Sequence, residues 1–239
     1  MYYWDDFKKI YNTGSENADY FRYHFYEQFS EIDFRGKTVL EVGCGKGFVS
    51  LYIAMLTGAY HVTAIDEAVG RGSKIGILDA LKENIGHLGL ESHLKAIEAD
   101  ALTYQSKPFD IIIANNCLHH FVDNGKQYWK DPIVANGYQN MFRHFAELLQ
   151  NDGRLLIKEF DPFNIWRYIS PNSFFTNIDW SIHPPFSGWL DAIRKATFYP
   201  FYVKTVVPYK LRAAQQIFAK GMFRPLFKGG VLIYCCKGI

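Results

Sequence analysis

Residues 38–50 constrain this chain more than any other stretch, because an apolar run there ends in glycines at every second position. The segment reads Thr-Val-Leu-Glu-Val-Gly-Cys-Gly-Lys-Gly-Phe-Val-Ser. Residues 38–42 have the composition of a buried strand, and apolar residues follow a helical spacing from Gly47 onward. The glycines therefore occupy a strand-to-helix turn, where missing Cβ atoms permit positive φ and let a ligand approach the backbone.

Strand-like runs and helical periodicities alternate along the first two thirds of the chain. The sequence predicts strands at 38–42, 61–65, 94–98, 109–114 and 154–160. It predicts helices at 47–56, at 73–88 with Ser73 as the N-cap, and around Met141 to Leu149. Strands that alternate with helices indicate a parallel sheet with helices on both faces.

The two ends of this pattern differ from its middle. Residues 1–34 hold 12 of the 41 aromatic residues and predict one or two helices, and residues 160–190 hold another 9. Residues 161–190 show no period, and an insertion of this length in a compact domain is usually a lid or a binding loop. Beyond it, the sequence predicts a helix at 187–198, a strand at 202–209, a basic helix at 211–223 and a strand at 231–236.

The glycine spacing separates two nucleotide-binding motifs. The dinucleotide fingerprint Gly-x-Gly-x-x-Gly would need a glycine where Phe48 stands, whereas this chain has Gly-x-Gly-x-Gly preceded by Glu41. That pattern resembles the first motif of class I S-adenosylmethionine-dependent methyltransferases of the small-molecule or lipid type. Three further segments resemble the later motifs of that family, at 61–66, 97–101 and 109–120.

The resemblance covers residues 36–160 and implies an α/β fold, a Rossmann-like doubly wound sheet of seven strands in the order 3-2-1-4-5-7-6. The length fits one methyltransferase domain over residues 1–239. Within it we expect a helical cap, a cofactor-binding core, an aromatic-rich lid, and a C-terminal helix with antiparallel edge strands; these parts span 1–35, 36–160, 161–190 and 191–239.

The resemblance also implies which residues hold S-adenosylmethionine. Near the methionine portion and the ribose these are Glu41, Gly43, Cys44, Gly45, Gly47 and Asp66. Asp66 would accept hydrogen bonds from the two ribose hydroxyls, a geometry that suits a carboxylate. At the adenine and the ammonium group they are Asp100, Ala101, Asn115 and Leu118. No metal is expected.

Candidates for catalysis follow the fourth and fifth strands. Methyl transfer from a sulfonium is an in-line displacement, so a base is needed only when the acceptor must lose a proton. His119 and His120 follow strand four, and an imidazole suits that role near neutral pH. The alternative is that the rings of His119 and His120 pack beside the cofactor and take no part in catalysis. Glu159 and Asp161, at the end of strand five, are the next candidates.

The aromatic insertion indicates the kind of acceptor. An aromatic-walled chamber suits a hydrophobic or aromatic small molecule or a lipid-like acceptor, methylated at O, N or C. The residues expected to contact the acceptor are Phe163, Trp166, Tyr168, Trp180 and His183, and further lining candidates are Phe174, Phe175 and Trp189. Several of these aromatic rings are equally expected to pack the insertion onto the sheet.

Charge is distributed unevenly along the chain. Nine basic residues and no acidic residue follow Asp191, whereas residues 1–191 hold 17 basic and 24 acidic residues. A basic amphipathic stretch at 204–228 can lie on an anionic membrane or simply form a solvated rim. With no signal peptide and four cysteines without metal spacing, we expect a cytoplasmic protein, peripheral to a membrane if this stretch binds one.

Three alternatives share parts of this pattern. An RNA methyltransferase uses the same fold, but base-amine methylators carry Asn/Asp-Pro-Pro-aromatic where this chain has Asn116-Cys-Leu-His, and the total charge is low for a nucleic-acid partner. A non-catalytic module that binds S-adenosylmethionine would keep the same loop. A dehydrogenase of the dinucleotide-binding type is disfavoured by Phe48.

Overall fold

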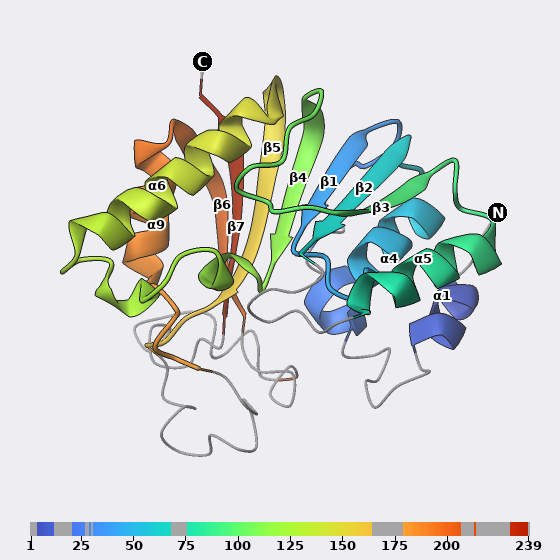
Figure 1. Ribbon diagram of the computed structural model, residues 1–239, viewed down its shortest axis with the longest axis horizontal. Coiled ribbons are helices and arrows are strands. Elements are labelled where there is room, and N and C mark those ends of the chain that lie inside the picture. The colour runs from blue at the N-terminus through green and yellow to red at the C-terminus, as the bar shows by residue number, and fades with distance from the viewer. Residues whose placement is uncertain are drawn as a thin grey trace. The chain divides into compact units, whose positions relative to one another are not determined.

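The computed structural model describes residues 4–11, 21–26, 29, 31–67, 76–163, 179–206, 213 and 230–238. Its strands follow the order β3-β2-β1-β4-β5-β7-β6 in a sheet of seven (Figure 1). This confirms the predicted α/β fold and strand order. The chain divides into two compact units, Met1–Ala114 and Asn115–Ile239.

The strands of the first unit are parallel, as the alternation with helices predicts. They are β1 (Thr38–Val42), β2 (His61–Asp66), β3 (Leu94–Glu98) and β4 (Phe109–Asn115). β1 pairs with β2 and with β4, and β2 pairs with β3. Since β1, β2 and β4 are buried almost throughout, their apolar residues form the core of this unit.

The helices of the first unit are α1 (Trp4–Tyr11), α4 (Phe48–Leu56) and α5 (Ile77–Leu88), with a π-helical turn at Arg22–Tyr26. The ring of Phe7 in α1 lies 5.7 Å from that of Tyr52 in α4, so aromatic packing joins these helices. α5 begins at Ile77 after Gly76, which has a φ of 81°. The predicted start at residue 73, with Ser73 as N-cap, lies outside the described residues.

The second unit holds the antiparallel part of the sheet. Its elements are the 3₁₀ turns Leu118–His120 and Gly125–Gln127, then α6 (Pro132–Glu147), β5 (Leu149–Phe160), α9 (Phe186–Lys195), β6 (Phe198–Val206) and β7 (Gly230–Lys237). β7 pairs antiparallel with both β5 and β6. In Figure 1, α6 and α9 lie beside one another in this unit.

Several boundaries in this unit differ from the predictions for local reasons. α6 starts at Pro132 rather than near Met141, because the Asp131 side chain accepts a hydrogen bond of 2.8 Å from the Ile133 amide at the helix start. β5 begins at Leu149, where the preceding helix was predicted to end, and so starts five residues before the strand predicted at 154–160. α9 begins at Phe186, inside the predicted insertion. The basic helix predicted at 211–223 lies outside the described residues apart from Ala213.

No helix among the described residues is both long and apolar enough to cross a membrane.

Trp189 is the central side chain of the second unit's core. It lies on α9 with no exposed surface, and its ring makes edge contacts with Tyr138 at 5.0 Å and Phe142 at 6.2 Å, both from α6. One indole therefore joins the two helices of this unit. Trp189 was also a candidate for lining an acceptor chamber, and the structure places it in the core instead.

Replacing this indole tests that packing. We expect Trp189→Ala to lower the free energy of unfolding by about 3 to 5 kcal/mol, because it leaves a large cavity between two helices. The matched control is Trp129→Ala, whose side chain is 58 % exposed and which should cost under about 1 kcal/mol. Urea unfolding of both variants measures the difference, and equal losses would contradict this account of the core.

Candidate functional site

The glycine loop between β1 and α4 has the conformation that its sequence predicts. Gly43, Gly45 and Gly47 have φ values of 62°, 53° and 69°, all in the left-handed region. At Gly47 a Cβ atom would also run into the side chain of Leu81, which is fully buried. Glycine is therefore required there by both conformation and space.

Asp66, the last residue of β2, fixes this loop. Its Oδ2 accepts a hydrogen bond of 2.7 Å from the amide of Gly45, and the side chain is buried. A further backbone bond of 3.0 Å joins the Cys44 amide to the Ile65 carbonyl. The end of β2 thus holds the loop that follows β1. The role expected for Asp66 toward a ribose stays a prediction.

Glu41 ties β1 to the first turn of α4. Its carboxyl group is buried, and its Oε2 accepts hydrogen bonds from the amide of Ser50, at 2.9 Å, and from the Ser50 hydroxyl. Burial, against the opposing effect of these bonds and with a contribution from Asp66, raises the pKa of Glu41 to about 8. Glu41 is therefore mostly protonated and uncharged at neutral pH, and its hydrogen bonds to Ser50 join β1 to α4 beneath the loop.

The remaining predicted cofactor residues of the first unit lie after β3. The Asp100 carboxylate accepts hydrogen bonds from the Leu102 amide at 2.8 Å and the Thr103 hydroxyl at 3.3 Å, which shape the turn after the strand. Ala101 is buried. The adenine contacts expected of both residues stay predictions.

In the chain that follows β4, the backbone turns sharply. Asn115 ends the strand, and Asn116 has a φ of 50° and donates a hydrogen bond of 2.8 Å from its amide to the Lys158 carbonyl. The amide of the buried Leu118 donates 2.7 Å to Oε1 of Glu159. The turn is thus fastened to β5 within the second unit.

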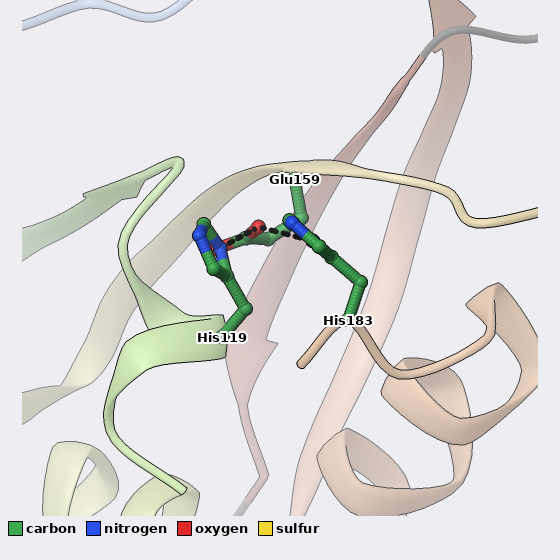
Figure 2. Close-up of side chains that lie close together, drawn as sticks. All are labelled: His119, Glu159 and His183. Carbon is green, nitrogen blue, oxygen red and sulfur yellow. Dashed lines mark hydrogen bonds and ion pairs between the residues drawn. The ribbon is translucent and has the colours of Figure 1, made fainter. Parts of the chain in front are cut away.

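The structure brings together His119, Glu159 and His183, which come from three separate elements of the second unit (Figure 2). Nδ1 of His119 lies 2.8 Å from Oε2 of Glu159, and Nδ1 of His183 lies 3.9 Å from the same oxygen. All three side chains are buried, and the two imidazole rings stack with centroids 3.9 Å apart. The half-buried His120 ring lies 4.0 Å from that of His119 and outside this cluster.

The electrostatics of the cluster favour an ionised carboxylate beside neutral His183. Burial alone would raise the pKa of Glu159, but the facing His119, together with His183 and the Leu118 amide, holds it below its usual value. Burial, followed by the neighbouring His119, lowers the pKa of His183 to about 4. The cluster therefore presents one buried negative charge between two imidazoles.

A pocket of about 820 Å³ opens beside this cluster in the second unit. Phe163, Trp180 and His183, three of the five residues predicted to contact the acceptor, line it, and Trp166 and Tyr168 lie outside the described residues. The other lining residues are Lys126, Trp129, Lys130, Pro162, Asp179, Ser181, Pro185 and Ser187.

Two walls of the pocket are joined to one another. The Lys126 amide donates a hydrogen bond of 3.3 Å to the Ser181 carbonyl. The Trp129 indole donates a hydrogen bond of 3.2 Å to the Ser187 hydroxyl. At Gly125 there is no room for a Cβ atom against the Ile182 carbonyl. The segments 125–130 and 181–187 therefore form one continuous wall.

A model of a methyltransferase domain matches residues 15–193, three quarters of the chain, including the whole glycine loop. The chain belongs to the methyltransferase domain family. This confirms the resemblance to class I S-adenosylmethionine-dependent methyltransferases on which the cofactor site was predicted.

Two curated relatives each match about half of this chain. A probable (S)-tetrahydroprotoberberine N-methyltransferase 2 of Papaver bracteatum is 30 % identical over 127 residues, 49 % of this chain and 34 % of that protein. A tRNA1(Val) (adenine(37)-N6)-methyltransferase of Flavobacteriaceae bacterium (strain 3519-10) is 28 % identical over 126 residues, 51 % of this chain and 50 % of that protein. The match thus spans between a third and a half of the relatives' lengths.

Solved structures share the fold at low identity. Geranyl diphosphate C-methyltransferase from Streptomyces coelicolor A3(2), in complex with Mg²⁺, geranyl diphosphate and S-adenosyl-L-homocysteine, superimposes with a TM-score of 0.66 at 16 % identity, covering 98 % of this chain and 86 % of that one. The pyocyanin biosynthetic protein PhzM superimposes with a TM-score of 0.60 at 15 % identity, covering 91 % of this chain and 55 % of that one.

Sequence reasoning missed part of the pocket of this methyltransferase domain. Lys126, Trp129 and Lys130 lie on short turns without a helical or strand period, so periodicity gave no sign of them. It also missed Lys158, a buried lysine on β5 whose pKa burial lowers to about 7. A lysine in the middle of an apolar strand was the one available signal.

The protonated state of Glu41 has a measurable consequence for stability. An ordinary glutamate in the unfolded chain ionises near pH 4.5, whereas the folded pKa is about 8, so the folded state keeps an extra proton between these values. The contribution of Glu41 is fully present below pH 4.5 and is lost as the pH rises toward 8, at up to about 1.4 kcal/mol per pH unit. We expect Glu41→Gln, measured by urea unfolding from pH 5 to 8, to lose this slope.

The control for that series is Glu83→Gln, which changes an exposed carboxylate on α5 and should keep the wild-type slope. If the free energy of unfolding of Glu41→Gln changes with pH in parallel with that of the wild type, Glu41 is ionised in the folded protein.

Proposed function

We propose that this protein transfers the methyl group of S-adenosylmethionine to a hydrophobic or aromatic small molecule. The observation that carries the proposal is the left-handed glycine loop after β1, held by the Asp66 carboxylate through the Gly45 amide. Such a loop at the carboxyl end of a parallel strand is where α/β sheets bind nucleotides. Membership in the methyltransferase domain family supports this cofactor.

For the cofactor, we propose the residues that the family motifs imply. Gly43, Cys44, Gly45 and Gly47 would border the methionine portion, Asp66 the ribose, Asp100 and Ala101 the adenine, and Asn115 and Leu118 the ammonium group and the ring. Glu41 makes its described bonds to Ser50, so we assign it to shaping the loop. We also propose that residues 1–239 form one methyltransferase domain, supported by the match over 15–193.

For the acceptor, we propose the pocket of the second unit. Its walls combine the rings of Trp129, Phe163 and Trp180 with the cations of Lys126 and Lys130. Aromatic walls suit an apolar or aromatic body, and few polar groups suffice to orient it. Solved structures of similar fold act on a geranyl diphosphate, and a curated relative on a tetrahydroprotoberberine, which supports an acceptor of this kind.

The reaction requires little from the protein beyond alignment and exclusion of water. A lone pair of the acceptor forms the new bond to the methyl carbon, the carbon–sulfur bond breaks, and its electron pair stays on sulfur as a neutral thioether. A hydroxyl or amine acceptor also releases a proton. We propose that His119, His120 and Glu159 assist the loss of this proton from the acceptor. Imidazoles and a carboxylate can do so either as bases or as ligands of a Lewis acid.

The tRNA methyltransferase among the relatives keeps an RNA acceptor as the second candidate. Contact of residues 204–228 with an anionic membrane stays a prediction, since most of that segment lies outside the described residues. A cytoplasmic location also stays a prediction.

Cofactor binding is tested by calorimetric titration with S-adenosylmethionine. We expect micromolar binding by the wild type, none by Gly45→Arg, and at least about tenfold weaker binding by Asp66→Ala, which loses the charge-assisted bond to the loop. Gly86→Arg, on an open face of α5 with no neighbour within 4 Å of its Cβ position, is the matched control and should bind normally. Binding of NAD in place of S-adenosylmethionine would contradict the proposal.

The acceptor pocket is tested by transfer of labelled methyl groups to three probes: geranyl diphosphate, a tetrahydroprotoberberine and an unmodified tRNA transcript. We expect transfer to one of the two small molecules, with Trp180→Ala reducing kcat/KM by about tenfold or more through lost ring contacts. Tyr199→Ala, an exposed aromatic on β6, should leave the rate unchanged. Transfer to tRNA alone would replace the small-molecule proposal with the RNA alternative.

A further inference from the structure

Two imidazoles and a carboxylate converge at one point in the second unit. His119 comes from the 3₁₀ turn after β4, Glu159 from β5 and His183 from the loop before α9. In Figure 2 a dashed line joins each imidazole to the Glu159 carboxylate. One ligand atom from each lies within 4.8 Å of the other two, and no residue of the cluster is more than 6 % exposed.

The donor set is one that transition metals use. Two histidines and one carboxylate bind zinc in several hydrolases and ferrous iron in oxygenases, with open coordination positions left for water or substrate. Bonds of 2.0 to 2.2 Å to one ion place neighbouring ligand atoms roughly 3 to 3.5 Å apart. The separations here, 2.8 Å and 3.9 Å from Glu159 Oε2, lie on either side of that range. Because the two imidazole rings stack, with centroids 3.9 Å apart, one ring must also rotate out of the stack before both nitrogen atoms point at one ion.

Two further features point to a ligand at this place. Nδ1 of His183 is buried without a hydrogen-bond partner among the described residues, and a buried polar atom left so is costly. The second oxygen of Glu159 is held by the Leu118 amide at 2.7 Å. Metal-ligating carboxylates are usually oriented by an outer hydrogen bond of this type.

We propose that His119, Glu159 and His183 bind a first-row divalent transition-metal ion through Nδ1, Oε2 and Nδ1. The ion would replace the proton that His119 Nδ1 shares with Oε2, and that proton passes to solvent. Nitrogen ligands favour such an ion over Mg²⁺ or Ca²⁺, which prefer oxygen. The single carboxylate offsets part of the ion's charge in a buried site.

The position of His183 links this ion to the proposed acceptor site. Because His183 also lines the pocket, an oxygen or nitrogen atom of an acceptor there could take an open coordination position. The ion would then lower the pKa of an acceptor hydroxyl, whose proton passes to water before the oxygen attacks the methyl carbon. Only this role rests on the proposed function; the binding site does not.

Metal binding is tested on untagged protein that has been treated with EDTA and dialysed. We expect Co²⁺ to bind at one equivalent with visible absorption bands, and Zn²⁺ to displace it, at micromolar concentrations. His183→Gln and Glu159→Gln should each weaken Co²⁺ binding at least about tenfold, since each removes a ligand. His144→Gln, which changes a largely buried imidazole on α6 outside the cluster, is the matched control and should bind as the wild type does.

Wild-type protein that binds neither ion, or His183→Gln that binds as tightly as wild type, would overturn the proposal. The wild-type titration decides the question even if a variant does not fold. Titration of the same samples with S-adenosylmethionine keeps the two proposals apart: metal binding without cofactor binding refutes the proposed function alone, and the reverse refutes only the metal site.

Discussion

Buried carboxylates organise both units of this protein, and each must be compensated where it lies, because an isolated charge in a protein interior is very costly. The Asp66 carboxylate accepts a hydrogen bond from the Gly45 amide. The Glu159 carboxylate accepts hydrogen bonds from the Leu118 amide and the His119 imidazole. Glu41 instead holds a proton. The loop after β1 and the turn after β4 take their shapes from these bonds, so the candidate binding residues depend on them.

The sheet could be predicted because its signals are local. β1 and its glycine turn follow from an apolar run and from the glycine spacing, whereas the order of the strands was implied by the resemblance to the methyltransferase family; the structure confirms both. Element boundaries were less accurate. The part of β5 that pairs with β7, Arg154 to Phe160, coincides with the strand predicted at 154–160, whereas the structure extends β5 back to Leu149 through Asn151-Asp152-Gly153, a sequence typical of a turn.

The residues of the His119, Glu159 and His183 cluster were each singled out in the sequence, but their contact with one another was not. His119 and Glu159 were each expected to follow a strand end, yet their contact joins residues 40 positions apart, which spacing along the chain does not show. His183 was expected beside an acceptor, and it also faces Glu159. Lys126 and Trp129 lie on turns whose conformation depends on tertiary contacts, so no periodicity marks them.

The continuous wall formed by segments 125–130 and 181–187 has a consequence for how this pocket can change. Backbone and side-chain hydrogen bonds join the two segments, and at Gly125 there is no room for a Cβ atom against the Ile182 carbonyl, so a substitution at that position would disturb the wall. The rings of Phe163 and Trp180 line the same pocket outside these segments, so an exchange there changes the space in the pocket without removing those bonds. Relatives with the same framework could acquire new molecular preferences by exchanging these two rings, without any rearrangement of the backbone.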